Sequence, residues 1–255
     1  MINYLKSECY RVLHARVIYG ITVLLGVLAF SLNLLLYLFG GQYGIVSFSY
    51  SNLVAAPMLF GVMGLVTALI LYEGGQRNGN LKNTVAWGVS RSKIFLVQCI
   101  VSMAVSTAIM ILVLGIWVMS ADYLLEKRGP VQMSDLLAEV PAVYLTAAAC
   151  LISGLLLQQL LGNTTAVILV WMTVWFVLPK ILLYAGLRFE IFYPIAMWLP
   201  ANFFDVVNGG HVNMQECITV WDTTEGMIRC VLSGAAGTLL FTLAGTVLLR
   251  KRDLK

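Results

Sequence analysis

The feature that most constrains this chain is a series of apolar stretches, each long enough to cross a lipid bilayer. A membrane-spanning helix needs about 20 consecutive, mostly apolar residues. Lipid offers no hydrogen bonds, so a spanning segment must satisfy its own backbone, as an α-helix does. We therefore predict an all-α integral membrane protein that forms one domain with six transmembrane helices. The predicted spans are residues 17–39, 52–72, 94–119, 141–161, 166–185 and 227–249.

Composition excludes the main soluble classes. Hydrophobic residues make up 60% of the chain and charged residues only 11%, whereas a soluble domain carries about 25% charged residues. A disordered chain would need low hydrophobicity and high charge. The net charge is +4, too little to build a domain-sized basic face, so we expect no nucleic-acid partner.

Two segments outside the spans have a predicted form. Residues 1–16 alternate basic and apolar side chains, which is typical of an amphipathic helix lying in the membrane interface. A signal peptide does not fit, because the next apolar stretch is too long and has no small-residue cleavage site. Residues 186–226 contain apolar clusters interrupted by Pro194 and Pro200. They suggest an extracellular segment with a re-entrant or surface-lying pair of short helices. Pro141 suits a first helical turn and sets the predicted start of the fourth span.

The distribution of charge predicts the orientation. Basic residues concentrate on the cytoplasmic side of membrane proteins. If both termini are cytoplasmic, 11 of the 16 basic residues lie inside: Lys6, Arg11, Arg16, Arg77, Lys82, Arg91, Lys93, Arg250, Lys251, Arg252 and Lys255. Only three of the 12 acidic residues lie there: Glu8, Glu73 and Asp253. We expect a multi-pass protein of a bacterial cell membrane with both ends in the cytoplasm.

The sequence lacks the usual catalytic and energy-coupling motifs. It has no Gly-x-x-x-x-Gly-Lys-[Ser/Thr], no Gly-x-Ser-x-Gly and no His-Glu-x-x-His. Its two histidines and five cysteines lack metal-ligand spacing, so we expect no catalytic residue, no metal and no cofactor bound by this chain. Lys180, near the outer end of the fifth span, either snorkels to the interface or contacts a cargo. Any transport would need work from a partner.

Polar and small residues inside the spans have two interpretations. The polar side chains either line a weakly polar cleft or bond one helix to another. They are Asn33, Gln98, Ser102, Ser106, Thr107, Gln158 and Gln159. The glycine pairs Gly61/Gly64 and Gly234/Gly237 predict places where two helices approach closely.

The segment 73–93 is the most informative part of the cytoplasmic side. Its central residues 80–87 form a short amphipathic unit with Leu81, Val85 and Trp87 on one side. Such a unit either docks into a groove of a soluble partner or forms a basic interfacial loop held by lipid headgroups. The residues alone leave both interpretations open.

A resemblance favours the first interpretation. The order Tyr72-Glu73, Gly79-Asn80-Leu81-Lys82-Asn83 and Gly88-Val89-Ser90-Arg91-Ser92-Lys93-Ile94, with a basic end after the last span, resembles the type-2 permeases of ATP-binding-cassette (ABC) exporters. That resemblance implies two six-span permease subunits, identical or different, on a dimer of separately encoded cytoplasmic ATPase subunits. ATP and Mg²⁺ would be held by the ATPases.

The resemblance also implies roles for particular residues. Glu73 would fix the coupling segment, Arg91 would lie at the membrane edge, and the residues near the ATPase groove would be Asn80, Leu81, Lys82, Thr84 and Trp87. The translocation path would run between the two permease subunits, lined mainly by spans 1, 2 and 5, with Asn33 and Lys180 as candidate path residues. A lantibiotic, another membrane-active peptide or a drug is the expected amphiphilic cargo. The alternatives are a non-transport assembly or sensor subunit and, less well supported, an intramembrane enzyme without a recognised motif.

Overall fold

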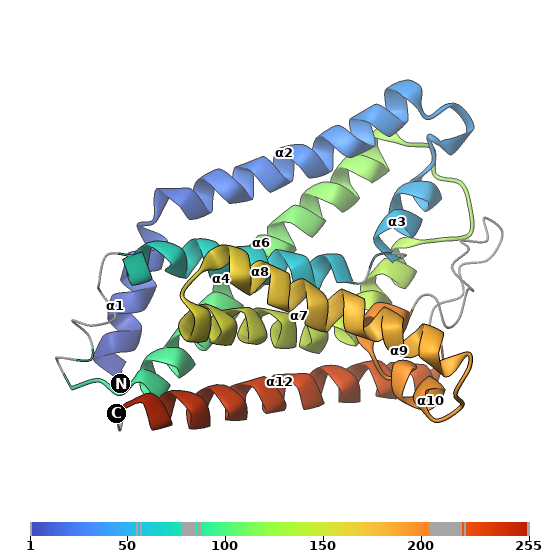
Figure 1. Ribbon diagram of the computed structural model, residues 1–255. Coiled ribbons are helices and arrows are strands. Elements are labelled where there is room, and N and C mark those ends of the chain that lie inside the picture. Colours follow the sequence, from blue (N-terminus) through green and yellow to red (C-terminus); the bar gives the residue numbers. More distant parts are fainter. Residues whose placement is uncertain are drawn as a thin grey trace.

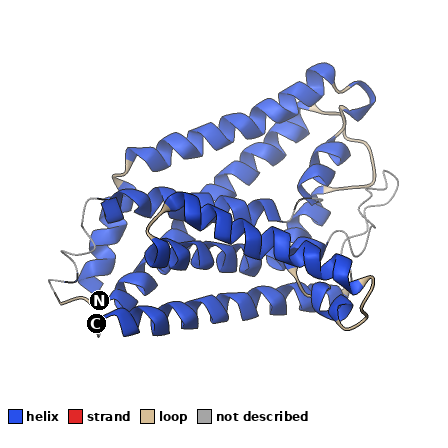
Figure 2. Ribbon diagram, viewed as in Figure 1, coloured by secondary structure: helices blue, strands red, loops and turns tan. Residues whose placement is uncertain are grey.

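The computed structural model describes residues 2–54, 56, 58–77, 85, 88–203, 221 and 223–253, leaving aside the side chains of residues 2, 73–77 and 251–253. The described chain is helical and holds no β-strand (Figure 2). Its elements, in chain order, are α1 Ile2–Leu13, α2 Arg16–Phe39, η1 Gly41–Tyr43, α3 Val46–Val54, α4 Met58–Arg77, α6 Arg91–Leu124, α7 Met133–Leu161, α8 Thr164–Met172, η2 Thr173–Val177, α9 Leu178–Gly186, α10 Phe192–Ala196, η3 Pro200–Asn202 and α12 Thr224–Asp253.

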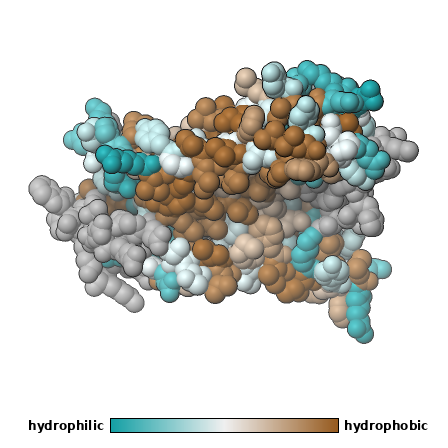
Figure 3. All heavy atoms as spheres, turned by 90° about the horizontal axis from the view of Figure 1, so that it is seen from above, coloured by the Kyte–Doolittle hydropathy of each residue, from teal (hydrophilic) through white to brown (hydrophobic). Residues whose placement is uncertain are grey.

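The helices have the length and composition of a multi-pass membrane protein. Five of them are long and apolar enough to cross a bilayer, and a sixth span exists if α3 and α4 are counted together. Five of the six predicted spans each lie inside one of these helices. Apolar side chains cover the middle of the molecule, and polar side chains gather toward its two ends (Figure 3).

The second predicted span, residues 52–72, is not one straight helix. Helix α3 ends at Val54, α4 begins at Met58, and the two are bent by 67°. The sequence places Pro57 between them. A proline has no backbone N–H to donate and disfavours helical geometry in the residue before it, which accounts for the break.

The fourth predicted span begins earlier than expected. Helix α7 starts at Met133, and Pro141 lies inside it rather than in its first turn. The start is fixed by Asp135, whose Oδ2 accepts a hydrogen bond of 2.8 Å from the backbone N–H of Gln132. The carboxylate thereby accepts a hydrogen bond from a backbone N–H at the helix start, which has no acceptor within the helix. Pro141 then costs one backbone hydrogen bond inside the helix.

The fifth span contains a local irregularity. Residues 164–186 run as α8, the π-helical turn η2 and α9, with Pro179 in the first turn of α9. The short helix α10 then packs back against α9. This return needs a small residue at Gly186, because a Cβ there would lie 2.8 Å from the backbone of Tyr193. Two short helices lie between the last two spans, as predicted, at residues 192–196 and 200–202.

Helix α7 is the centre of the bundle. In its most apolar 18-residue stretch, about 67% of the residues are buried, against 22% or less in the corresponding stretch of each of the other four candidate spans. Its main neighbours are α4 and α12 (Figure 1). A Cβ on Gly61 or Gly64 of α4 would press on Cys150 or Leu151 of α7.

Helix α12 approaches α7 in the same way. A Cβ on Gly234 would lie 2.6 Å from the backbone nitrogen of Thr146, and one on Gly237 would lie 3.1 Å from Ala149 Cβ. The predicted role of both glycine pairs in close helix approach is confirmed.

The bundle divides into two groups of helices. Helix α2 packs mainly on α6, whereas α4 and α12 pack mainly on α7, and α6 contacts both groups. At one end, a backbone link ties the loop after α6 to the start of α3: Val46 N–H donates to Glu126 O at 3.0 Å. The described N- and C-terminal helix ends both lie at the opposite end (Figure 1).

Replacing Gly234 with Leu should lower the free energy of unfolding by about 1–3 kcal/mol, the usual cost of overpacking a tight contact. Thermal unfolding of the detergent-purified protein measures the change. Gly20→Leu is the matched control, because a Cβ on Gly20 of α2 meets nothing within 4 Å. Equal melting temperatures for the two variants would contradict the close packing of α7 and α12.

Candidate functional site

Four helix ends meet at the end of the bundle that holds the termini. They are α1, the last turns of α4, the start of α6 and the end of α12 (Figure 1). Val12 of α1, Phe95 of α6 and Leu249 of α12 are 2%, 0% and 1% exposed and belong to one apolar cluster. A displacement of one of these helix ends must therefore disturb the packing of the others.

Arg11 fastens α1 to the end of α4. Its Nη1 donates a 3.0 Å hydrogen bond to the carbonyl oxygen of Leu71. Its guanidinium carbon lies 5.0 Å from the ring centroid of Tyr72, a cation–π distance. The contact lies directly before the segment 73–93.

The orientation of Arg11 is set within α1 itself. Glu8 Oε2 accepts hydrogen bonds from Arg11 Nη2 at 2.7 Å and from Nε at 3.0 Å. Tyr4 donates to the other carboxylate oxygen, Oε1, at 3.0 Å. Burial and the nearby Glu8 charge raise the pKa of Tyr4 well above its ordinary value, so its hydroxyl stays a donor. The chain Tyr4–Glu8–Arg11 thus holds the guanidinium against α4.

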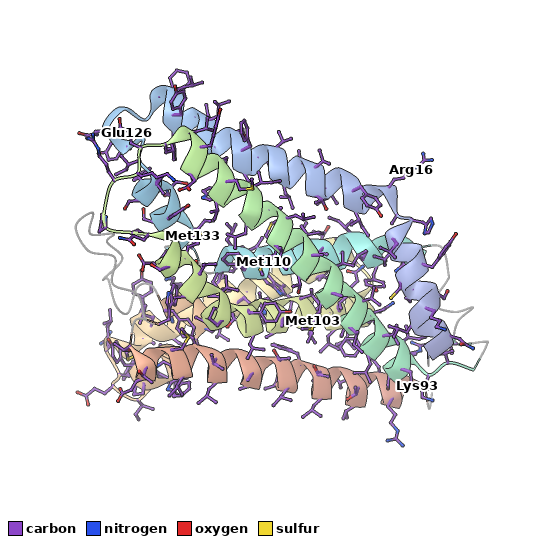
Figure 4. The ribbon with its side chains drawn as sticks, turned by 180° about the vertical axis from the view of Figure 1, so that it is seen from behind. Arg16, Lys93, Met103, Met110, Glu126 and Met133 are labelled. Atoms are coloured by element: carbon purple, nitrogen blue, oxygen red, sulfur yellow. The ribbon has the colours of Figure 1, made fainter. Side chains whose placement is uncertain are left out.

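The start of α6 is joined to α12 in a similar way. Ser92 Oγ donates a 3.0 Å hydrogen bond to the carbonyl oxygen of Thr246. Lys93 at the start of α6 and Arg16 at the start of α2 lie at this same end (Figure 4). Arg91, predicted to sit at the membrane edge, is the first residue of α6 and is half-buried.

Most of the other predicted coupling residues lie outside the part of the chain that the structure describes. Glu73 lies on helix α4, and its side chain is not described. Outside the described residues lie Asn80, Leu81, Lys82, Thr84 and Trp87. Their proximity to an ATPase groove stays a prediction.

Asn33 forms hydrogen bonds between helices and does not line an open path in this structure. It is 0% exposed. Its Nδ2 donates to Ser120 Oγ at 2.8 Å and to the carbonyl oxygen of Trp117 at 3.0 Å, and its Oδ1 accepts from Ser49 Oγ at 2.6 Å. One amide therefore joins α2, α3 and α6. Of the two interpretations of the polar residues in the spans, Asn33 fits the interhelical one.

The two helix groups enclose an apolar cavity. Its volume is about 240 Å³, and its walls come from α2, α3, α4, α6 and α7. Met63, Met103, Met110 and Leu151 are among the lining residues, and Figure 4 shows Met103 and Met110 along the middle of α6. The cavity belongs to one chain, so it differs from the predicted path between two subunits, and neither Asn33 nor Lys180 of α9 lines it.

Two threonines of the mostly apolar cavity wall are bonded to protein. Thr107 Oγ1 donates to the carbonyl oxygen of Met103 at 2.7 Å and lies 2.9 Å from Tyr144 OH. Thr67 Oγ1 donates to the carbonyl oxygen of Met63 at 2.9 Å. The wall therefore has little capacity to bind a charged molecule and suits an apolar one.

Glu139 is a buried acid that the sequence did not single out. It lies near the N-terminal end of α7 and is 0% exposed, and neither carboxyl oxygen has a hydrogen-bond partner among the described residues. An isolated buried carboxyl group is costly and usually adopts its neutral form. No group of three or more His, Cys, Asp or Glu side chains that could hold a metal ion occurs among the described residues.

Comparison of the chain with protein-family models, curated proteins and solved structures gave no match. The assignment of a function therefore rests on the residues and the geometry described above.

Replacing Glu139 with Met should raise the free energy of unfolding by about 1–3 kcal/mol, because the variant no longer buries a polar group without a partner. The midpoint of thermal unfolding in detergent measures this. Glu190→Met is the control, because Glu190 is exposed and its replacement relieves no burial. A lower melting temperature for Glu139→Met would show instead that the carboxyl group holds a stabilising contact.

Proposed function

We propose that this chain is the membrane-spanning permease subunit of an ABC exporter, which moves an amphiphilic cargo with work supplied by a separate ATPase subunit. The observation that carries the proposal is the joining of four helix ends beside the segment 73–93. Arg11 binds the Leu71 carbonyl only a few residues before this segment begins. Ser92 binds the Thr246 carbonyl at the point where the segment ends.

These contacts suit a mechanical coupling element. Helices α4 and α6 enter and leave the segment 73–93, and α1 and α12 are bonded to them. A partner that binds this segment and changes shape on ATP binding would transmit force through these joined helix ends to the less tightly packed α6. The partner shifts the population of permease conformations by the difference in its affinity for them.

The division of the bundle into two groups indicates which helices would move relative to each other. Helix α6 contacts both the α2 side and the α7 side, so a tilt of α6 changes the spacing between the two groups. Helix α7, held by glycine contacts to α4 and α12, would act as the fixed part. The α2–α6 pair would move relative to it and alternate between inward-open and outward-open states.

The orientation and the assembly follow the same proposal. The end with Arg11, Arg16, Arg91 and Lys93 faces the cytoplasm under the positive-inside rule, and α1 lies in the inner interface. In the most apolar 18-residue stretches of α2 and α12, only 17% and 11% of the residues are buried. Their outward faces are available to lipid and to a second permease subunit.

Substituting Asp for both Leu81 and Trp87 should reduce co-purification of an ATPase subunit at least tenfold. Two charges in an apolar docking surface each cost more than the 1.4 kcal/mol that corresponds to a factor of ten. Pull-down of the intact complex, with identification of its subunits by mass spectrometry, measures the loss, and the fraction of the variant in washed membranes should not change.

Tyr123→Asp is the matched control. Tyr123 is an exposed aromatic residue, 87% accessible, near the opposite end of the bundle, so its replacement should leave co-purification intact. A wild-type chain that purifies without any ATPase, or a double variant that retains the ATPase fully, would contradict the proposal and favour an assembly or sensor role.

A further inference from the structure

The cavity between the two helix groups has the features of a lipid-binding site. It occupies about 240 Å³ inside a single chain. An engineered protein cavity of about 150 Å³ binds benzene, so this one has room for an apolar group somewhat larger than one ring. An empty space of this size would deprive its lining side chains of dispersion contacts on one side.

The lining of the cavity extends furthest along α6. Along α6, the lining residues extend from Met103 to Trp117. At 1.5 Å per residue, that distance is about 21 Å along the helix axis. On α2 the lining runs over less than this, from Leu25 to Leu32. An apolar wall of this length on α6 can contact an unbranched hydrocarbon chain that lies along the helix.

The cavity borders the surface that faces lipid. Leu28 and Leu32 of α2 and Leu59 of α4 line it and are 49%, 48% and 45% exposed. Helix α2 packs on α6 far more than on α4, so the side between α2 and α4 is the weakly closed one. A chain from the bilayer can enter there without passing through water.

One polar donor remains at the far end of α6. The indole nitrogen of Trp117 is buried and has no hydrogen-bond partner among the described residues. The carbonyl oxygen of the same residue is bound by Asn33. Trp117 lies seven residues before the end of α6 at Leu124, on the side of the helix end that leads to Glu126. An ester carbonyl, found where lipid headgroup and acyl chain join, is an acceptor that suits this donor.

We propose that this cavity binds part of one acyl chain of a membrane lipid, which enters between α2 and α4 with its ester end near Trp117. The bound chain fills the space between the α2–α6 pair and the α4–α7 pair. This site lies within a single subunit and does not depend on the proposed export function.

Photo-crosslinking in reconstituted vesicles tests the site. The probe is phosphatidylcholine with a diazirine on one acyl chain, and mass spectrometry locates the adducts. We expect adducts on the lining residues Met103, Met110 and Tyr144, in addition to adducts on the exposed lipid-facing residues Ile111 and Leu112. Adducts confined to Ile111 and Leu112 would overturn the proposal.

A cavity-filling variant provides the second arm. Ser106 lines the cavity, and Ser106→Phe should reduce the adducts on Met110 and Tyr144 at least fivefold while leaving those on Leu112 unchanged. Ile111→Phe, at a residue that is 62% exposed on the same helix, is the control and should leave the adducts on Met110 and Tyr144 unchanged. Undiminished cavity adducts in the Ser106 variant would contradict the site.

A small aromatic probe distinguishes a lipid from a free apolar molecule. If a phenyldiazirine in the vesicles labels Met103 and Met110 while the lipid probe does not, the cavity accepts small molecules and excludes acyl chains, and the proposal is wrong. This comparison needs only the wild-type protein, so it holds even if the filled variant fails to fold.

Discussion

The close approach of α4 and α12 to α7 is the contact on which the rest of the structure depends. In a bilayer, apolar side chains gain little from leaving lipid, so helices associate through tight packing and hydrogen bonds between them. Glycines at 61, 64, 234 and 237 let both neighbours come within contact distance of the α7 backbone or its small side chains. Trp171 and Trp175 add hydrogen bonds of 3.0 Å to Cys150 O and Ser153 Oγ of the same helix. Helix α7 is thereby fixed on three sides.

The α2–α6 pair is less tightly packed than the helices around α7. The α2–α6 pair is joined to the rest by a small number of polar contacts, among them Thr107 with Tyr144, and by the apolar cluster at the terminal end. That end also carries the Arg11 contact to the Leu71 carbonyl. The α2–α6 pair and the segment 73–93 are therefore connected through one set of helix ends, and under the proposed function the ATPase would act through these ends.

Hydropathy predicted most of the fold because lipid imposes a simple rule on length and polarity. It located five helices, and the spacing of the glycine pairs predicted the close contacts between them. It missed the bend between α3 and α4, since the apolar run 52–72 continues through Pro57 and only the proline marks the break. It also placed the start of α7 at Pro141, whereas a polar cap at Asp135 sets that start.

The site residues were harder to predict, because their roles depend on which side chains meet across helices. The charge distribution predicted that Glu139 was one of several extracellular acidic residues, and only the packing of α7 shows that its side chain is buried. Asn33 had two interpretations until its three partners on neighbouring helices were visible. Arg11 was counted as a basic residue of an amphipathic helix, and nothing in its sequence neighbourhood indicated a bond to Leu71, 60 residues away.

The most direct test of the account is the side of the membrane on which the two ends of the bundle lie. Cys9 on α1 is exposed, and Lys127→Cys provides a second probe in the loop after α6, where the lysine side chain is 67% accessible. Each is placed alone in a chain whose other cysteines are replaced by alanine, and intact cells are treated with a membrane-impermeant maleimide. The account predicts that the cysteine at 127 reacts in intact cells and that Cys9 reacts only after permeabilisation. Reaction of Cys9 in intact cells would place α1 and the segment 73–93 outside, beyond the reach of any cytoplasmic ATPase, and would contradict it.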